Sequence, residues 1–344
     1  MKSPRVSVLI PTYNYARYLP EAIESVLEQD WRDLELLISD DCSTDGSREV
    51  ISRYAAQDSR VRFHIHRTNL GLVENWNWCL AEARGEYVKF LFGDDKLATP
   101  QALTKLVNLL DTNPSAVLAA SARFVIDENS RVINLWDSAG PPGLHQGAEV
   151  IARSMDQYGN IIGEPSVVMF RRRAAARGFN VGYRQLVDLE MWFALLETGD
   201  LAYASEPLCC FRQHARQQTE ANRSNQLGDI EIARLFWEYR RKAYLAPYGL
   251  RRLLFRQAYK LKKQHNVGAE SLRIERGLLD DLGRLWYAAY WSHYKLTRPF
   301  QNLGRWQRRR RHKAALRAAS NSGRTKEIKA LAQPATPPTR TKAL

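Results

Sequence analysis

The stretch RVSVLIPTYNYARYLPEAIESVLEQDWRDLELLIS, residues 5–39, predicts the unit from which the fold is built. Its first seven residues are mostly β-branched or apolar, as in a buried strand. Leu19, Ile23 and Val26 then recur at helical spacing, and the apolar run 34–39 predicts a second strand. A strand, a helix and a strand in this order are typical of a parallel βαβ unit.

The alternation of strands and helices continues to residue 92. Strands are expected at 61–66 and 86–92, one helix after the loop 40–47, and another over 73–83. The order βαβαβαβ predicts an α/β fold with a mostly parallel sheet and helices on both faces. Right-handed crossovers bring the carboxyl ends of the strands to one edge, where ligands bind. No Gly-rich phosphate loop follows the first strand, which argues against a dinucleotide oxidoreductase or a P-loop NTPase.

Polar segments follow the ends of all four strands, and one of them carries adjacent carboxylates. In VKFLFGDDKLATP, residues 88–100, an apolar run ends at Asp94 and Asp95. Two neighbouring carboxylates at the end of a buried strand need a proton, a basic partner or a cation. Hard oxygen ligands suit Mg²⁺ or Mn²⁺, which commonly bind together with phosphates. The alternative is a solvated acidic loop that caps the helix near Pro100.

Beyond residue 100 the pattern changes. A helix is expected at 103–110, strands at 116–126, 131–136 and 201–204, and a helix at 187–199. Residues 221–318 are basic, aromatic and helical, and the composition of 319–344 predicts a disordered tail.

The formal net charge of +14 indicates an anionic partner, and much of the excess lies near the C-terminus. The basic aromatic helices are compatible with an anionic membrane surface or with a solvated appendage. A nucleic-acid-binding protein is the alternative, but no known motif of that class accompanies the charge, so we expect no nucleic acid partner. Four cysteines without zinc or disulfide spacing favour a reducing compartment. With neither a leader nor a membrane span expected, we predict a cytoplasmic protein, peripheral on the inner face of the membrane.

Several ordered segments of the chain resemble glycosyltransferase family 2. They are VSVLIPTYNYARYLPEAIESVLEQDWRDLELLISDDCSTDGS, NLGLVENWNWCLAEARGEYVKFLFGDD, GEPSVVMFRR, DLEMW and EPLCCFRQH, and they span about residues 5–219. The resemblance implies a GT-A fold and an inverting enzyme that uses a nucleotide-diphosphate sugar. On this basis residues 1–220 form the catalytic domain, with a nucleotide-binding half at about 1–100 and an acceptor half at about 101–220.

The resemblance also assigns the donor site. It implies that nucleotide-binding residues are Pro11, Thr12, Tyr13, Asn14, Asp40, Asp41, Asn69, Gly71 and Asp94. A carboxylate can accept an imide N–H of a base, although Asp40 and Asp41 can equally cap the following helix. Asp95, Asp94 and His214 are expected to bind Mg²⁺ or Mn²⁺, and Arg212 and His214 to contact the diphosphate. A structural role is the alternative for His214.

The resemblance assigns the chemistry of the acceptor side as well. Asp188 matches the general base of the family, with a helix cap as its alternative role. A cap would lower its pKa. Glu164, Ser166 and Glu190 are expected to bind the acceptor, Glu190 being the substitute base, while an ordinary turn is the alternative for Glu164.

The implied reaction moves a sugar from a UDP-, dTDP- or GDP-sugar to a saccharide or lipid-linked glycan acceptor, in bacterial surface polysaccharide or envelope glycan synthesis. Two departures from the family pattern are visible. Phe92 replaces an Asp found in many members, and Val187 replaces a common Glu. They leave open how Asp94 and Asp95 share metal and sugar contacts, and whether the chain is a non-catalytic nucleotide-sugar-binding protein.

Overall fold

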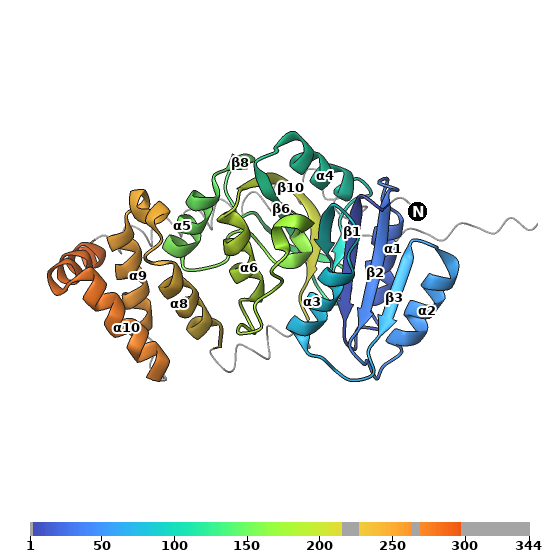
Figure 1. The fold of residues 1–344 in the computed structure, drawn as a ribbon, viewed down its shortest axis with the longest axis horizontal. Coiled ribbons are helices and arrows are strands. Elements are labelled where there is room, and N and C mark those ends of the chain that lie inside the picture. Colours follow the sequence, from blue (N-terminus) through green and yellow to red (C-terminus); the bar gives the residue numbers. More distant parts are fainter. Residues whose placement is uncertain (1–2, 215–226, 263–268, 297–344) are drawn as a thin grey trace, which may run out of the picture.

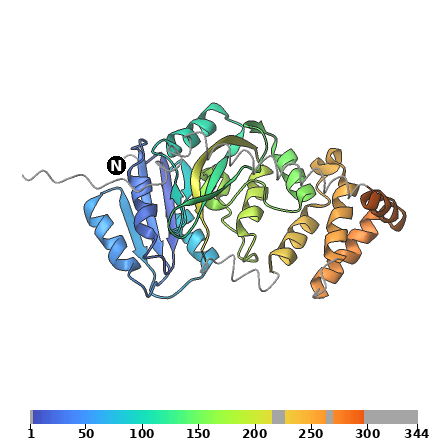
Figure 2. The same ribbon diagram turned by 180° about the vertical axis from the view of Figure 1, so that it is seen from behind.

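The computed structural model describes residues 3–214, 227–262 and 269–296. A ten-stranded sheet with helices on both faces forms its centre (Figures 1 and 2). The strands are β1 (Val6–Thr12), β2 (Leu34–Asp40), β3 (Val61–Ile65), β4 (Tyr87–Phe90), β5 (Lys96–Leu97), β6 (Ala116–Ile126), β7 (Val132–Trp136), β8 (Gly143–His145), β9 (Val168–Arg171) and β10 (Asp200–Arg212). The α-helices are α1 (Leu19–Leu27), α2 (Ser47–Gln57), α3 (Leu72–Glu82), α4 (Ala102–Thr112), α5 (Gly147–Gln157), α6 (Val187–Leu196), α8 (Leu227–Tyr239), α9 (Leu250–Lys262) and α10 (Ala269–Leu282). Short 3₁₀ helices are η1 (Pro165–Val167), η2 (Arg172–Ala175) and η3 (Ala243–Tyr248).

The predicted α/β fold class is confirmed, and the sheet is parallel in its first half. The strand order is β3-β2-β1-β4-β9-β6-β10-β5, with β7 beside β6 and β8 beside β10. The pairs among β3, β2, β1 and β4 are all parallel. Farther along, β9 runs antiparallel to both β4 and β6, whereas β10 is parallel to β6. The parallel half therefore presents the carboxyl ends of four strands at one edge.

Strands β1, β2 and β4 of the parallel half are buried on both faces, which explains their largely apolar sequences, whereas the edge strand β3 is partly exposed. Every residue of β1 and β2 is buried. The turn into β4 packs closely on β1, because a Cβ added at Gly85 would lie 2.6 Å from the backbone nitrogen of Ser7. Only glycine fits this close approach of the two backbones.

The C-terminal helices lie at the end of the molecule farthest from β3 (Figure 1). Helix α8 joins the main core through its apolar face, at Ile232, Leu235, Phe236 and Tyr239. A second, smaller core lies among α8, α9, α10 and the helical residues 284–296. The region expected to be helical is thus helical where the structure describes it, whereas the expected disordered tail lies outside the described residues.

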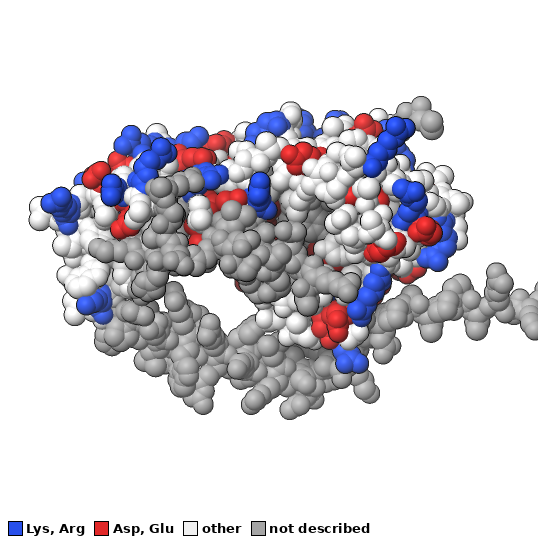
Figure 3. All heavy atoms as spheres, turned by 90° about the horizontal axis from the view of Figure 1, so that it is seen from below, with Lys and Arg blue, Asp and Glu red and all other residues white. Residues whose placement is uncertain are grey.

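Charges of both signs lie together on one face of the molecule. Figure 3 shows Lys and Arg side chains intermixed with Asp and Glu on the face seen from below. In the described parts of the chain, no helix is both long and apolar enough to cross a membrane.

Candidate active site

Three loops at the carboxyl edge of the parallel strands are joined through Asp41. Its two carboxylate oxygens accept hydrogen bonds from the backbone N–H groups of Leu70 (2.6 Å) and Gly71 (3.0 Å). The side-chain amide of Asn69 donates to the backbone oxygen of Asp41 at 3.0 Å. The backbone N–H of Asp41 donates to Thr12 at 2.9 Å. The structure therefore brings together the predicted residues from the loops after β1, β2 and β3.

Asn14 connects the first loop to the second. It adopts a left-handed backbone with φ of 59°, its own N–H donates to the Ser43 hydroxyl, and its side-chain oxygen accepts from the N–H of Thr44 at 2.8 Å. Tyr13 beside it is 47% exposed, so its ring is available to a ligand. Pro11 and Thr12, by contrast, are buried within β1. These two predicted residues therefore support the loop from within the sheet.

Asp40 is fully buried at the end of β2. One carboxylate oxygen accepts the N–H of Ser43 at 3.0 Å, a contact within the loop that precedes α2 and not a cap of that helix, which begins at Ser47. The other oxygen has no hydrogen-bond partner among the described residues. Asp45 accepts from the N–H and hydroxyl groups of Ser47 at the start of α2 and from the N–H of Ala16.

Asp94 and Asp95, called the doublet from here on, lie in the turn after β4. Oδ1 of Asp95 accepts the backbone N–H of Arg212 at 2.8 Å, while the buried Oδ2 has no hydrogen-bond partner among the described residues. Burial, followed by the charge of Asp94, raises the pKa of Asp95 well above its ordinary value. Oδ2 of Asp94 lies 3.1 Å from Nε2 of His214. Of the three predicted metal-binding side chains, Asp94 and His214 are therefore in contact, whereas Asp95 has one oxygen on the backbone of Arg212.

Two tyrosines that the sequence did not single out surround His214. The imidazole lies edge-on to Tyr15, with ring centroids 5.9 Å apart, and against Tyr18 at 5.1 Å. Burial and the charge of Asp94 raise the pKa of Tyr15, so its phenol stays protonated and is a donor beside the doublet. The segment PTYNYARY contained the signal, since its tyrosines follow a strand end.

Arg212 does not face the edge of the sheet as expected. Its side chain is fully buried, and its Nε donates to the backbone oxygen of Asp94 at 2.6 Å. Its terminal nitrogens donate to the backbone oxygen of Asp127, to the hydroxyl of Ser130 and to the carboxylate of Glu21. The predicted diphosphate contact is wrong for this conformation, because these donors are directed into the protein. Arg212 instead donates hydrogen bonds to both residues of the doublet from the interior of the protein.

Ser166 is also a supporting residue. It is fully buried, and its hydroxyl accepts the N–H of Phe92 at 3.0 Å. The buried ammonium of Lys89 donates to the backbone oxygens of Ser166 and Phe90. These bonds connect η1 to the turn that carries the doublet. The predicted acceptor contact of the Ser166 side chain is therefore wrong in this structure, because that side chain has no exposed surface.

Asp188 lies in the first turn of α6 and keeps part of its surface open. Its Oδ2 accepts the side-chain N–H of Asn160 at 3.1 Å, and its Oδ1 accepts the N–H of Leu189 at 2.7 Å. Burial raises the pKa of Asp188 to about 7, with a smaller contribution from the charge of Glu164. The direction is opposite to that expected of a helix cap. A carboxyl group with this pKa can exchange a proton at neutral pH.

The other predicted acceptor residues are in ion pairs. Glu164 lies 2.6 Å from the guanidinium of Arg123, and the largely buried Glu190 lies 2.9 Å from that of Arg177. The charge of Glu164 contributes to the raised pKa of both Asp95 and Asp188. The charge of Glu164 therefore acts on Asp95 of the doublet and on Asp188 of α6.

The donor set of the doublet fits a divalent cation that shares its coordination with a substrate. Within the described ranges, no three His, Cys, Asp or Glu side chains converge as a complete metal site. The carboxylate of Asp94 and the imidazole of His214 are nevertheless in contact, and one buried oxygen of the neighbouring Asp95 has no hydrogen-bond partner among the described residues. Mg²⁺ typically takes one or two protein carboxylates and completes its coordination with phosphates and water.

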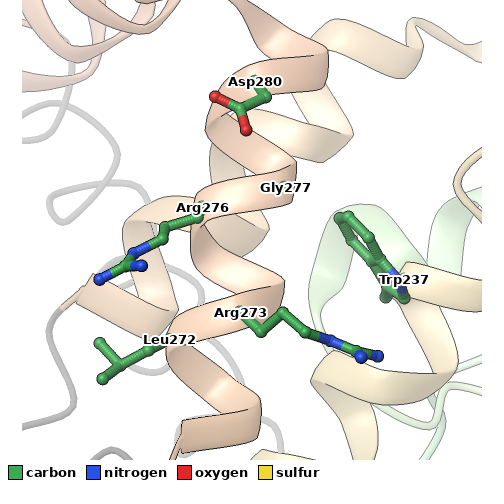
Figure 4. Close-up of a pocket in the computed structure, with 6 residues that line it drawn as sticks. All are labelled: Trp237, Leu272, Arg273, Arg276, Gly277 and Asp280. Carbon is green, nitrogen blue, oxygen red and sulfur yellow. The ribbon is translucent and has the colours of Figure 1, made fainter.

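A separate hollow of about 570 Å³ lies between α8 and α10 (Figure 4). It is lined by Trp237, Leu272, Arg273, Arg276, Gly277 and Asp280. None of these residues belongs to the site described above.

The sheet with helices on both faces, which carries a carboxylate doublet at the edge of its parallel half, defines the class as an α/β protein. The chain belongs to glycosyl transferase family 2, because the model of that family matches residues 7–179. The predictions of family and of glycosyltransferase activity are thereby confirmed.

Curated relatives support this assignment. A Bacillus subtilis protein described as a glycosyltransferase, EpsE, is 32% identical over 208 residues, covering 58% of this chain and 69% of that protein. TuaG of the same organism, described as a glycosyltransferase of teichuronic acid biosynthesis, is 29% identical over 58% of this chain and 75% of its own length.

Solved structures agree in fold. Residues 1–349 of S. aureus TarS superpose with a TM-score of 0.59 at 19% identity, covering 81% of this chain and 80% of that one. The mannosyltransferase PcManGT from Pyrobaculum calidifontis, in complex with GDP-Man and Mn²⁺, gives a TM-score of 0.51 at 17% identity, covering 93% and 87%.

Proposed function

We propose that this glycosyltransferase inverts the anomeric carbon of a nucleotide-diphosphate sugar as it transfers that sugar to a hydroxyl group. The observation that carries the proposal is Asp188, a carboxylate with a pKa near 7 that Asn160 orients in the first turn of α6. In the reaction, the acceptor oxygen forms a bond to the anomeric carbon while the bond from that carbon to the β-phosphate oxygen breaks. Asp188 receives the hydroxyl proton, and the nucleoside diphosphate leaves with the bonding electrons.

The donor is proposed to lie along the carboxyl edge of β1, β2 and β4. Tyr13, which is exposed, would lie against the base, and Asp40 or Asp41 would accept its imide N–H. Both oxygens of Asp41 already accept backbone N–H groups and would have to be shared with a base, whereas one oxygen of Asp40 has no partner among the described residues. UDP-, dTDP- and GDP-sugars are the donor classes to test.

Asp95 and Asp94, with His214, are proposed to bind Mg²⁺ or Mn²⁺. When bound, the ion would neutralise the charge that develops on the leaving diphosphate. Arg212 supports this arrangement by fixing both aspartates from the protein side. Tyr15 donates a hydrogen bond at the same place.

The acceptor is proposed to be a saccharide or a lipid-linked glycan in bacterial surface polysaccharide synthesis. TuaG is described as acting in teichuronic acid biosynthesis. A Campylobacter jejuni relative, 38% identical over 95 residues that cover 27% of this chain and 31% of its own, is named a GalNAc(5)-diNAcBac-PP-undecaprenol beta-1,3-glucosyltransferase. Glu164 and Glu190 are proposed near the acceptor, although each would have to share its arginine partner.

A lipid-linked acceptor makes contact with the inner face of the cytoplasmic membrane useful, and we propose a peripheral association there. The helical residues 284–296 expose Leu285, Trp286, Trp291 and Leu296. Residues 297–344 hold 13 Lys and Arg and one Glu, which suits an anionic surface. Flotation with phosphatidylglycerol vesicles should show binding that salt weakens and that truncation of 284–344 abolishes. Equal flotation with neutral vesicles would contradict this part of the proposal.

A donor panel tests the reaction itself. Thermal shift with UDP-, dTDP- and GDP-sugars, with and without Mn²⁺, identifies the donor. Release of free nucleotide from that donor then measures turnover. Asp188→Asn is expected to lower turnover by about 10²–10⁴-fold while donor binding is retained. Near-normal turnover of this variant would show that Asp188 is not the base.

A further inference from the structure

The N-terminal turn of α6 lacks a cap from its own sequence. The residue at the cap position is Leu186, whose side chain cannot accept a hydrogen bond. The first backbone N–H groups of a helix, and those of the segment entering it, need acceptors from elsewhere when they are buried. This need is acute here because the proposed base, Asp188, stands two residues farther on.

Glu231 of α8 supplies these acceptors from 45 residues away in sequence. One carboxylate oxygen accepts the N–H of Arg184 at 2.8 Å, and the other accepts those of Gln185 (2.8 Å) and Leu186 (2.9 Å). The side chain is 2% exposed. A buried carboxylate with three backbone donors at a helix N-terminus is a strong, charge-assisted interaction.

The same helical region also holds the other end of α6. Glu197, which follows α6, accepts the Tyr244 hydroxyl at 2.9 Å and lies 2.8 Å from the ammonium of Lys242. In the middle of α6, the ring of Phe193 stacks on Phe236 of α8, with centroids 6.0 Å apart. Helix α6 is therefore fixed at its start, middle and end by residues 227–248.

We propose that Glu231 is a positioning residue for the transfer reaction: it fixes the N-terminal turn of α6 and thereby the carboxylate of Asp188. Residues 227–248 then belong to the catalytic machinery and do not form a detachable appendage. This inference rests on the proposed role of Asp188. It goes beyond that role in assigning to the C-terminal helices a function in turnover.

The test uses Glu231→Gln and Glu231→Ala in the full chain. The amide keeps the shape of the side chain but loses the charge and one accepting oxygen. We expect Glu231→Gln to lower kcat about tenfold and Glu231→Ala about 100-fold, since displacement of a catalytic group by about 1 Å costs this much. The KM for the donor selected from the sugar-nucleotide panel should change less than twofold, and the acidic midpoint of the kcat profile should move. Asp229→Asn, which changes an exposed carboxylate on the same helix, is the matched control.

Two further measurements separate this inference from the proposed function. Hydrogen exchange should show faster exchange of the amides of 184–190 in Glu231→Gln than in the control. In the Asp188→Asn background, Glu231→Gln should cause no further loss of the residual rate, because both residues act in one unit. A kcat equal to that of the control, a full additional loss in the double variant, or a parallel loss of donor binding would overturn the positioning role. If Asp188→Asn itself stays active, the assignment of Asp188 as the base fails. Unaltered exchange at 184–190 in Glu231→Gln would show, independently of that result, that Glu231 does not fix this turn.

Discussion

Asp188 links the pH dependence of turnover to that of stability, and the two are expected to have opposite signs. Burial raises the pKa of Asp188 from its ordinary 3.8 to about 7. The base form is then about 10% populated at pH 6 and about 90% at pH 8. If proton acceptance limits the reaction, kcat/KM should rise about tenfold across this range and then level off.

Stability should fall as pH rises, and most of this fall should come at lower pH than the rise in activity. A carboxyl whose folded pKa exceeds its unfolded value favours the folded state only while it is protonated, so the cost begins as pH rises through about 4 and is complete above about 7. The full shift corresponds to about 4 kcal/mol, and because the side chain keeps some solvent contact we take about 2–4 kcal/mol. Asp188→Asn removes this cost. It also places the amide donors of residues 160 and 188 opposite each other, which destabilises the folded state by about 1 kcal/mol.

The variant should therefore be inactive and yet more stable than the native chain by about 1–3 kcal/mol at pH 8, with a smaller gain at pH 5. Urea unfolding at both pH values measures the stabilities, and nucleotide release from pH 5.5 to 8.5 measures the activities. Glu206→Gln, which removes an exposed carboxylate paired with Lys105, should change neither profile. A kcat/KM that is flat between pH 6 and 8, together with a variant no more stable than the native chain at pH 8, would refute the reasoning.

Three further predictions concern the frame of the site. Changing Asp94 and Asp95 together to Asn should lower donor affinity at least tenfold and abolish its Mn²⁺ dependence in isothermal titration; an unchanged dependence would remove the metal from the proposal. Arg212→Met should destabilise the protein by about 2–4 kcal/mol in urea, since it leaves buried oxygens without donors, and a neutral result would contradict the observed hydrogen bonds. Gly147→Ala should cost about 1–3 kcal/mol, because its Cβ would lie 2.1 Å from the backbone oxygen of Leu196 and outweigh the better helix propensity of Ala. Gly159→Ala, with nothing within 4 Å of the added Cβ, is its control and should be nearly neutral.

Much of the fold could be predicted because local patterns decide it. The strand expected at 116–126 has those bounds, and the alternating elements to residue 92 are all present. The last strand could not be predicted in full. The expected segment 201–204 is part of β10, which runs to Arg212 across Pro207. Its pairing with β6 tolerates that proline through shifts in register on both sides, and only the partner strand makes this possible.

For the residues of the site, the position along the chain could be predicted from the sequence, but the orientation of the side chain could not. The doublet and Asp41 follow strand ends, a position visible in the sequence. The orientation of a side chain is not visible there, which is why Arg212 and Ser166 were expected to face ligands although both are buried. The roles of Lys89 and Glu231 could not be predicted, because their partners Ser166 and Gln185 lie 77 and about 45 residues away in sequence. A buried lysine within a strand was the one available signal for the former.

The two halves of the proposed chemistry are held by different long-range contacts. Arg212 at the end of β10 fixes the doublet, whereas Glu231 of α8 fixes the turn that carries Asp188. In the part of the chain that the structure describes, Arg212 and Glu231 contact different segments, and the charge of Glu164 contributes to the raised pKa of both Asp95 and Asp188. Donor binding and proton transfer should therefore respond separately to substitutions in the two supports. Glu164 is the position at which a single change in charge alters the proton affinity of both halves at once.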